Sequence, residues 1–184
     1  METKLIAPIA NRLSELAFEP KVIDGEIVEI LLEAARWAPS AHNEQPWRFF
    51  YATQDDPESF NRILNLLAAG NREWAKNASL LVISAAKKVL SHNGNINAYA
   101  EHDTGLATAN LLIQAEAMGL ASHPMGGFDK EEAVKLLNLK DDFKPMTAIA
   151  IGYKGDRTTL SENNQNRINK PRVRKNLNEI SRKV

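Results

Sequence analysis

The feature that most restricts the fold is a long segment, residues 100–120, with the sequence AEHDTGLATANLLIQAEAMGL. Alanine and other small residues dominate it, and apolar side chains occupy most of the circumference of the helix that it predicts. A helix of this kind is buried on more than one side, and its small residues allow a second helix to approach closely. Because a chain of 184 residues offers few other helices to cover it, the segment predicts a dimer.

Apolar periodicity along the rest of the chain predicts helices and strands in an order that does not alternate strictly, which favours an α+β fold. A first helix is expected over residues 6–16, and a second begins after Asp24, a favoured N-cap residue. Asp56 and Pro57 are typical of a helix start, and Gly70 is the expected end of that third helix. The expected strands are residues 47–52, 79–85 and 146–153.

The composition is typical of a protein that folds as one domain with a buried core, here residues 1–184, because 43% of the residues are hydrophobic and 25% are charged. The formal net charge of zero argues against a nucleic-acid partner, since such proteins carry a basic surface. The absence of cysteine excludes disulfides, thiolate metal sites and cysteine nucleophiles. Without a signal sequence or an apolar run of about 18 residues, we expect a cytoplasmic protein with no membrane partner.

The C-terminal segment, residues 154–184, differs in character from the rest of the chain. It contains nine lysines and arginines against three acidic residues, and few apolar residues that could anchor it. A segment of this composition does not fold by itself. We therefore expect a C-terminal arm that is either loose or wrapped around a partner.

Familiar catalytic and nucleotide-binding motifs are absent, including GxGxxG, the phosphate-binding P-loop, GxSxG and HExxH. The histidines are too scattered for a local metal motif, so no metal site is predicted. They are His42, His92, His102 and His123. Adjacent His102 and Asp103 are compatible with a proton-transfer pair, but a polar pair that bridges packed helices explains them more simply.

Three separate segments nevertheless fit one kind of chemistry. Arg12 and Ser14 place a guanidinium and a hydroxyl two residues apart, a combination that can grip a phosphate or a ribityl chain. The loop RWAPSAHNEQPWRFF, residues 36–50, is longer than a helix-to-strand connection needs. Residues 123–128 are expected to form another loop, whose paired glycines let backbone amides approach a flat ligand. Each segment alone has an ordinary explanation as surface, corner or turn.

Taken together and in this order, the segments resemble the FMN-dependent nitroreductase family. The resemblance is carried by IANRLSELAFEP, ARWAPSAHNEQPWRFF, GNREWAKNASLLV, GLASHPMGGFD, IAIGY and PRVRKNLNEI, together with the alanine-rich helix. It spans nearly the whole chain, and the APSxxNxQPW signature is specific. It implies an α+β fold with a central, mostly antiparallel sheet flanked by helices. It also implies an intertwined homodimer with two shared FMN sites and with the C-terminal arm extended over the partner subunit.

The resemblance assigns residues to FMN binding by their place in the motifs. The phosphate and ribityl end would be held by Arg12 and Ser14, with further positive charge from Arg172 and Arg174. The partner subunit would line the ring system with Pro39, Ser40 and Asn43. Asn71 would meet the pyrimidine edge of the flavin. The glycine loop would supply Pro124, Met125, Gly126 and Gly127, with the backbone of the last three facing the reactive flavin nitrogen.

The resemblance implies an oxidoreductase in which the flavin carries the chemistry, so that no side chain acts as catalytic acid or base. NADH or NADPH would reduce FMN, and an electron-poor acceptor such as a nitroaromatic or a quinone would then be reduced at the same open face. The alternative is a catalytically weak flavin-binding or interaction protein that keeps the fold. Bound FMN whose absorption is bleached by NADPH would support the enzyme, whereas a colourless protein would support the alternative.

The chain departs from the family pattern at three places. Many relatives have an arginine where this chain has Leu16, and one lost charged phosphate contact corresponds to about 2 kcal/mol of binding. Some relatives have a glutamate at the position of Gly126. The segment between Ala85 and Ala100 is too short for the helical excursion that often covers the pocket. We therefore expect an open site with little preference between acceptors.

Overall fold

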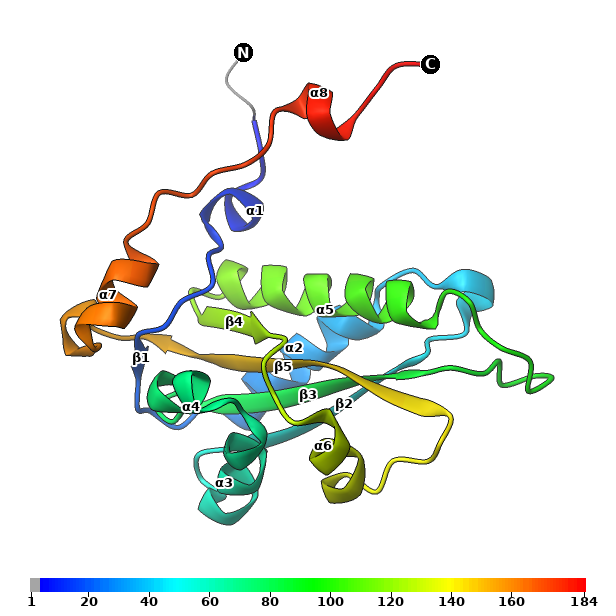
Figure 1. Cartoon of the computed structure of the whole chain (residues 1–184), viewed down its shortest axis with the longest axis horizontal. Helices are drawn as coiled ribbons and strands as arrows, with labels where there is room; N and C mark the ends of the chain where they lie inside the picture. The colour runs from blue at the N-terminus through cyan, green and yellow to red at the C-terminus, as the bar shows by residue number, and fades with distance from the viewer. Residues whose placement is uncertain (1–3) are drawn as a thin grey trace.

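The computed structural model of the protein describes residues 4–184, which form an open antiparallel sheet with helices on both faces (Figure 1). The strands lie in the order β1-β5-β3-β2, and β4 also pairs with β5. The strands are β1 (Phe18–Glu19), β2 (Trp47–Thr53), β3 (Leu80–Lys87), β4 (Ala121–Met125) and β5 (Phe143–Lys154). The helices are α1 (Ala7–Asn11), α2 (Gly25–Arg36), α3 (Pro57–Leu66), α4 (Ala69–Ala75), α5 (Ala100–Ala117), α6 (Lys130–Leu136), α7 (Glu162–Ile168) and α8 (Leu177–Ile180).

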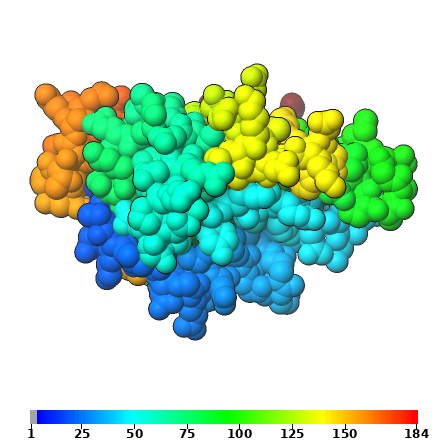
Figure 2. Space-filling model, turned by 90° about the horizontal axis from the view of Figure 1, so that it is seen from below, coloured from blue at the N-terminus to red at the C-terminus, as the bar shows by residue number. Residues whose placement is uncertain are grey.

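The two faces of the sheet carry different helices because neighbouring residues of a strand point to opposite sides. In β3, Leu81 and Ile83 pack in a core with α3, α4 and α6, whereas Leu80 and Val82 pack in a second core with α2 and α5. None of the four is more than 1% exposed, so β3 is buried on both faces, as its continuous apolar run predicts. Figure 2 shows the molecule from the side on which α3 and α4 cover the sheet.

Helix α5 confirms the prediction of a long helix rich in small residues. It is followed by Gly119, whose φ of 76° is the left-handed conformation that commonly ends a helix. Ala107 and Ala115 are fully buried in the core that α5 shares with α2, whereas Gly105 and Ala109 are exposed on another side. None of the helices formed by residues 4–184 combines the length and the apolar character needed to cross a bilayer.

Helix α1 is shorter than the sequence predicts. It ends at Asn11, and Arg12 already has a non-helical ψ of 127°. The backbone N–H of Glu15 instead donates to the carbonyl oxygen of Ser122 at 3.3 Å, and Leu16 enters the core with 1% of its surface exposed. The apolar spacing of this short segment fits both a helix and an extended chain, and the contact with β4 decides between them.

Helix α3 begins where the sequence predicts but ends earlier. The Asp56 side chain caps the helix that starts at Pro57, yet the last helical residue is Leu66 and not a residue next to Gly70. The backbone N–H of Asp129 donates to the carbonyl oxygen of Leu66 at 2.8 Å, which satisfies an acceptor at the end of the helix. Gly70 itself lies inside α4, so the prediction that it ends α3 was wrong.

Strand β4 occupies much of the segment that the sequence predicts as a loop. His123 lies opposite Ala150 of β5, and Pro124 lies opposite Ile149. A proline is tolerated in a strand at the edge of a sheet, so Pro124 does not prevent this pairing. The glycine loop therefore begins only at Gly126, directly after the last residue of β4.

Two contacts attach the start of the C-terminal arm to the N-terminal segment. The N–H of Gly155 donates to the carbonyl oxygen of Ala17 at 3.0 Å, and a Cβ at Gly155 would lie 2.6 Å from the carbonyl carbon of Phe18. The guanidinium of Arg157 donates to Oε2 of Glu15 at 2.8 Å. Beyond α7 the arm is exposed and passes α1 on its way to the C-terminus (Figure 1).

Glu15 is 5% exposed, and its carboxylate accepts hydrogen bonds from the adjacent backbone and from Arg157 of the C-terminal arm. Its burial acts to raise the pKa, but the hydrogen bonds from Arg157 and from the backbone of Ala17 and Leu16 outweigh burial and lower the pKa below its ordinary value. The folded state therefore favours the ionised form of this buried group.

Replacing Arg157 with alanine should leave the Glu15 carboxylate buried with fewer partners. We expect the free energy of unfolding at neutral pH to fall by about 1–2 kcal/mol, less than for a fully buried pair because Arg157 is partly exposed. Because folding lowers the pKa of Glu15, its stabilising contribution is present above the ordinary value of 4.5 and is lost as the pH falls through the folded-state pKa. Urea unfolding should therefore show a difference between the two proteins that shrinks in acid.

A matched control is Lys135→Ala, which removes an exposed pair with Glu132. This variant should lose much less stability than Arg157→Ala, because water and salt screen an exposed pair. Equal losses in the two variants would show that the contact between Arg157 and Glu15 is an ordinary surface pair.

Candidate functional site

A cleft of ≈ 670 Å³ opens beside α5 and is bounded by α1, the end of β4 and the C-terminal arm. It is lined by Leu5, Ile9, Ala10, Arg12, Ser14, Ala109, Leu112, Ile113, Pro124, Arg172 and Arg174. The sequence predicts five of these as site residues, from three segments that are far apart in the chain. The fold therefore brings Arg12, Ser14, Pro124, Arg172 and Arg174 to one cleft.

Contacts with β4 place the N-terminal segment at the cleft. Ser14 forms a parallel bridge with Ser122, and Nδ1 of His123 donates to the carbonyl oxygen of Glu15 at 2.8 Å. Burial lowers the pKa of the His123 imidazole, so the ring is neutral at neutral pH and carries its proton on Nδ1. The residues on either side of Ser14 are thus fixed to the strand that carries Pro124.

The three arginines give the cleft a positive end. Nη1 of Arg12 is buried and lacks a hydrogen-bond partner among the described residues. The pKa of Arg12 is lowered, first by burial and then by the neighbouring charges of Arg172 and Arg174, while Glu116 acts in the opposite direction. Glu116 already accepts a hydrogen bond from Lys154 at 3.1 Å. A bound anion would supply both the missing acceptor and the missing negative charge.

The two arginines of the arm are held in place through one nitrogen each. Nη1 of Arg172 donates to the carbonyl oxygen of Ala10 at 2.7 Å, and Nη1 of Arg174 donates to the carbonyl oxygen of Val173 at 2.8 Å. A guanidinium has five N–H donors, so each arginine keeps donors for a ligand after making these bonds. The bond to Ala10 also attaches the arm to α1.

A smaller hollow of ≈ 220 Å³ continues the cleft along α5. It is lined by Thr104, Gly105, Thr108, Ala109, Leu112, Pro124, Met146 and Thr147. Ala109, Leu112 and Pro124 line both hollows, so the two form one groove with an arginine end and an apolar end. A Cβ at Gly105 would meet no atom within 4 Å, which shows that the groove is open at this point of the helix. Such a groove suits a long ligand with an anionic group at one end and a flat ring system at the other.

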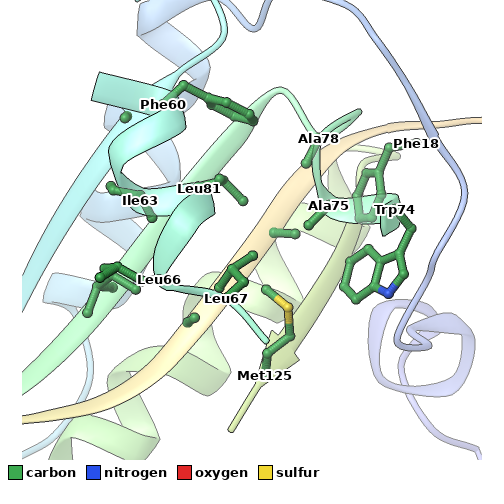
Figure 3. Packing of buried hydrophobic residues seen from close by; sticks show 14 of the residues in the cluster. Phe18, Phe60, Ile63, Leu66, Leu67, Trp74, Ala75, Ala78, Leu81 and Met125 are labelled. Atoms are coloured by element: carbon green, nitrogen blue, oxygen red, sulfur yellow. The ribbon is translucent and has the colours of Figure 1, made fainter. Parts of the chain in front are cut away.

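Asn71 and the glycine loop form a second group of predicted site residues. Nδ2 of Asn71 donates to the carbonyl oxygen of Gly127 at 3.1 Å, and the backbone N–H of Ala68 donates to the same oxygen at 3.0 Å. A Cβ at Gly127 would lie 3.2 Å from Nδ2 of Asn71, so glycine allows this approach. Met125 directs its side chain into the core beside Leu67 and leaves its backbone at the end of β4 (Figure 3).

Pro39, Ser40 and Asn43 form a third group, which does not line the cleft of its own chain. They lie in the loop between α2 and β2, around a single 3-10 turn at Ala41–Asn43. His42, Asn43 and Gln45 all have positive φ values, of 55°, 54° and 50°. The side-chain oxygen of Ser40 accepts a hydrogen bond from the backbone N–H of Gln45 at 3.0 Å, which closes the turn.

The structure changes the interpretation of Leu16 and adds residues that sequence reasoning did not find. Leu16 lies in the core with Phe18 and Trp74, so its side chain does not face the arginine end of the cleft. The α5 residues Ala109 and Leu112 line the groove but were not predicted as site residues. The sequence feature that could have identified them is the abundance of small and apolar residues on every side of α5.

The comparisons with known proteins agree on one family. The sequence profile of the Nitroreductase family matches residues 9–88 and 65–153, which together span most of the chain. A protein of Archaeoglobus fulgidus, provisionally named NADH dehydrogenase/NAD(P)H nitroreductase, is 29% identical over 84% of this chain and 87% of its own length. The chain belongs to the Nitroreductase family.

Solved structures support the same conclusion for the fold. A crystal structure described as an oxidoreductase containing FMN has a TM-score of 0.92 and 35% identity, covering 98% of this chain and 92% of that chain. A protein of Desulfovibrio desulfuricans, provisionally named a nitroreductase and solved in complex with FMN, has a TM-score of 0.74 at 22% identity. It covers 96% of this chain and 94% of its own. The predicted nitroreductase-like α+β fold is confirmed.

The packing of Asn71 against the glycine loop can be tested with two neighbouring glycines. Gly127→Ala should displace the Asn71 side chain, because the new Cβ would lie 3.2 Å from Nδ2, and should cost about 1 kcal/mol in unfolding free energy. Gly126→Ala is the control, since a Cβ there meets no atom within 4 Å. In an Asn71→Ala background the cost of Gly127→Ala should largely disappear. Equal costs for both glycine replacements in urea unfolding would disprove the contact.

Proposed function

We propose that the protein is an FMN-dependent NAD(P)H oxidoreductase that reduces electron-poor acceptors such as nitroaromatics or quinones. The observation that carries the proposal is the cleft where Arg12, Arg172 and Arg174 converge and where a buried guanidinium nitrogen has no partner among the described residues. In a chain of the Nitroreductase family, an anion site next to an apolar groove fits a flavin that ends in a phosphate. The NAD(P)H nitroreductase name of the Archaeoglobus relative supports the choice of electron donor.

The residues that line the groove fit the phosphate and ribityl end of FMN. The three arginines would hold the phosphate, with Ser14 at the ribityl chain and Pro124 at the start of the ring system. A phosphate monoester carries a charge of about −1.5 to −2 at neutral pH, which matches a site with three guanidinium groups. Asn71 would meet the pyrimidine edge, next to the backbone of Met125, Gly126 and Gly127.

The reaction would follow a ping-pong scheme with no catalytic side chain. When bound, FMN would supply the chemistry of hydride transfer between NADH or NADPH and the acceptor. The chain's own residues would bind and orient the flavin and both substrates. Arg12, Arg172 and Arg174 would also add positive potential that stabilises negative charge in the cleft.

We further propose that the active form is a homodimer with shared sites, in which each single-domain chain extends its C-terminal arm, residues 154–184, over the partner. Apolar side chains just before α1, in the arm and in α8 are largely exposed in the single chain, including Leu5 at 57%, Val173 at 78% and Leu177 at 69%. Figure 1 shows α1 and α8 standing away from the sheet. An apolar surface of this kind is typical of a protein interface. The loop with Ser40 and Asn43 does not line the cleft of its own chain, and in the dimer it would line the cleft of the partner subunit.

The alternative, a catalytically weak protein that keeps the fold, rested on Leu16 and on the short segment between Ala85 and Ala100. Leu16 is a core residue here, and the cleft has three arginines without a contribution from this position. We therefore favour the enzyme, with a cytoplasmic location and a small-molecule acceptor as further parts of the proposal.

The first test is a visible absorption spectrum of the purified protein, followed anaerobically while NADPH and then NADH are added. We expect flavin bands that bleach on addition of one nicotinamide and return on addition of a quinone or a nitroaromatic. The nicotinamide that bleaches the bands faster is the donor. A protein that remains colourless after incubation with FMN would overturn the proposal.

The arginines of the arm provide a second test. Replacing Arg172 and Arg174 with alanine should weaken FMN binding at least about 100-fold, because two charge-assisted hydrogen bonds are lost. The fold should persist, since both residues are exposed. The control is Lys175→Ala with Lys183→Ala, which removes the same charge from arm residues that do not line the cleft. Undiminished FMN affinity in the arginine variant, measured by flavin fluorescence, would remove the arm from the site.

A further inference from the structure

The loop between α2 and β2 is tied to α5 through one buried carboxylate. Asp103, in the first turn of α5, is 3% exposed, and its Oδ2 accepts a hydrogen bond from the backbone N–H of Ala41 at 2.9 Å. Its Oδ1 lies 2.9 Å from Nδ1 of His102. A carboxylate can only accept hydrogen bonds, so His102 carries its proton on Nδ1 in this contact. Both oxygens of Asp103 are thus engaged, and the first helical turn adds favourable electrostatics for a negative charge.

The loop needs such an anchor because its backbone is unfavourable by itself. Three residues that carry a Cβ, His42, Asn43 and Gln45, have positive φ values. A left-handed backbone is costly for such residues and persists only where the surroundings determine it. The bonds within the turn are local, such as the one from the Gln45 N–H to Ser40 Oγ. The bond to Asp103 joins residues 62 positions apart and sets where the whole turn stands relative to α5.

A second tether lies at the other end of the turn. Oε1 of Glu44 accepts a hydrogen bond from the backbone N–H of Ser91 at 2.6 Å, in the polar loop after β3. This bond reaches a segment without regular structure, whereas Asp103 belongs to an 18-residue helix. Helix α5 also supplies Ala109 and Leu112 to the groove. Asp103 therefore fixes the position of the loop relative to α5, the same helix that forms a wall of the cleft.

We propose that Asp103 is a positioning residue that holds the Ser40–Asn43 turn in the conformation required for flavin binding. The role of the turn rests on the proposed function, in which Ser40 and Asn43 line the flavin ring of the partner's site. His102 is the second partner of the carboxylate and is mostly exposed, with 67% of its side chain accessible. Its hydrogen-bond partner is Asp103, and no hydrogen bond joins its side chain to the turn among the described residues. A His102 variant therefore distinguishes loop positioning by Asp103 from proton transfer by the pair.

Three variants of α5 test the proposal through amide hydrogen exchange and FMN affinity. Asp103→Ala should speed exchange at residues 41–45 at least about tenfold and leave β3 unchanged, because only the local opening becomes easier. It should also weaken FMN binding about tenfold, the effect of one lost hydrogen bond. Asp103→Asn keeps an acceptor for the Ala41 N–H and should restore both values. His102→Ala should change neither.

Ala41→Pro probes the same bond from the loop side and protects the test against misfolding of an α5 variant. Proline removes the N–H donor at the first position of the 3-10 turn, where its φ is tolerated, and the preceding Ser40 already has the extended backbone that proline requires. Its FMN affinity should fall as in Asp103→Ala, and the double variant should lose no more than either single one.

The outcomes separate this proposal from the proposed function. Unchanged exchange at residues 41–45 in Asp103→Ala would overturn the anchor, as would equal effects of His102→Ala and Asp103→Ala. Fast exchange in Asp103→Ala together with wild-type FMN affinity would overturn the role in flavin binding. Failure of the wild-type protein to bind FMN would overturn the proposed function, whereas the exchange experiment would still decide whether Asp103 holds the turn.

Discussion

Strand β5 is the constraint on which the rest of the structure depends, because its backbone is paired along both edges. It pairs with β3 on one side and with β4 and then β1 on the other. Gly152 of β5 lies so close to the start of β3 that a Cβ there would be 2.8 Å from the backbone nitrogen of Ser79. Because β4 ends where it leaves β5, this pairing also decides where the glycine loop begins. The N-terminal segment, the loop and the start of the arm are therefore all positioned from one strand.

The positive charge of Arg12 in the cleft is unfavourable, and no free carboxylate among the described neighbours of Arg12 compensates for it. Burial and two like charges both act against the charged form of Arg12, and the one carboxylate that favours it, Glu116, already has a lysine partner. A bound anion removes this imbalance, so binding and folding are linked: a ligand at about 100 times its dissociation constant stabilises the folded state by about 2.7 kcal/mol. The residues whose positive charges repel one another in the free chain are thus those that would favour an anionic ligand.

Sequence reasoning succeeded where the residues of one segment carried the signal themselves: a long run of small and apolar residues, a continuous apolar run, or a cap at a helix start. Helix α5, the buried strand β3 and the start of α3 at Pro57 all have such a signal, and the motifs named five residues that the fold brings to one cleft. It failed where a distant hydrogen bond decided between two local structures. The bond from Glu15 to Ser122 made the segment after α1 extended, and the pairing of His123 with β5 made a strand from a segment that looked like a loop. No local pattern contains such information.

The alanine-rich sequence of α5 is explained by three different demands on one helix. Ala107 and Ala115 are small because the helix packs closely in the core that it shares with α2. Ala109 lies on the exposed wall of the groove, where a larger side chain would narrow the groove. Asp103 is the polar exception, and its burial is tolerated because both of its oxygens have partners. The sequence alone shows only a helix that is apolar on most sides. The positions of β4, the arm and the loop around α5 show which of its residues pack in the core, which line the groove and which anchors the loop.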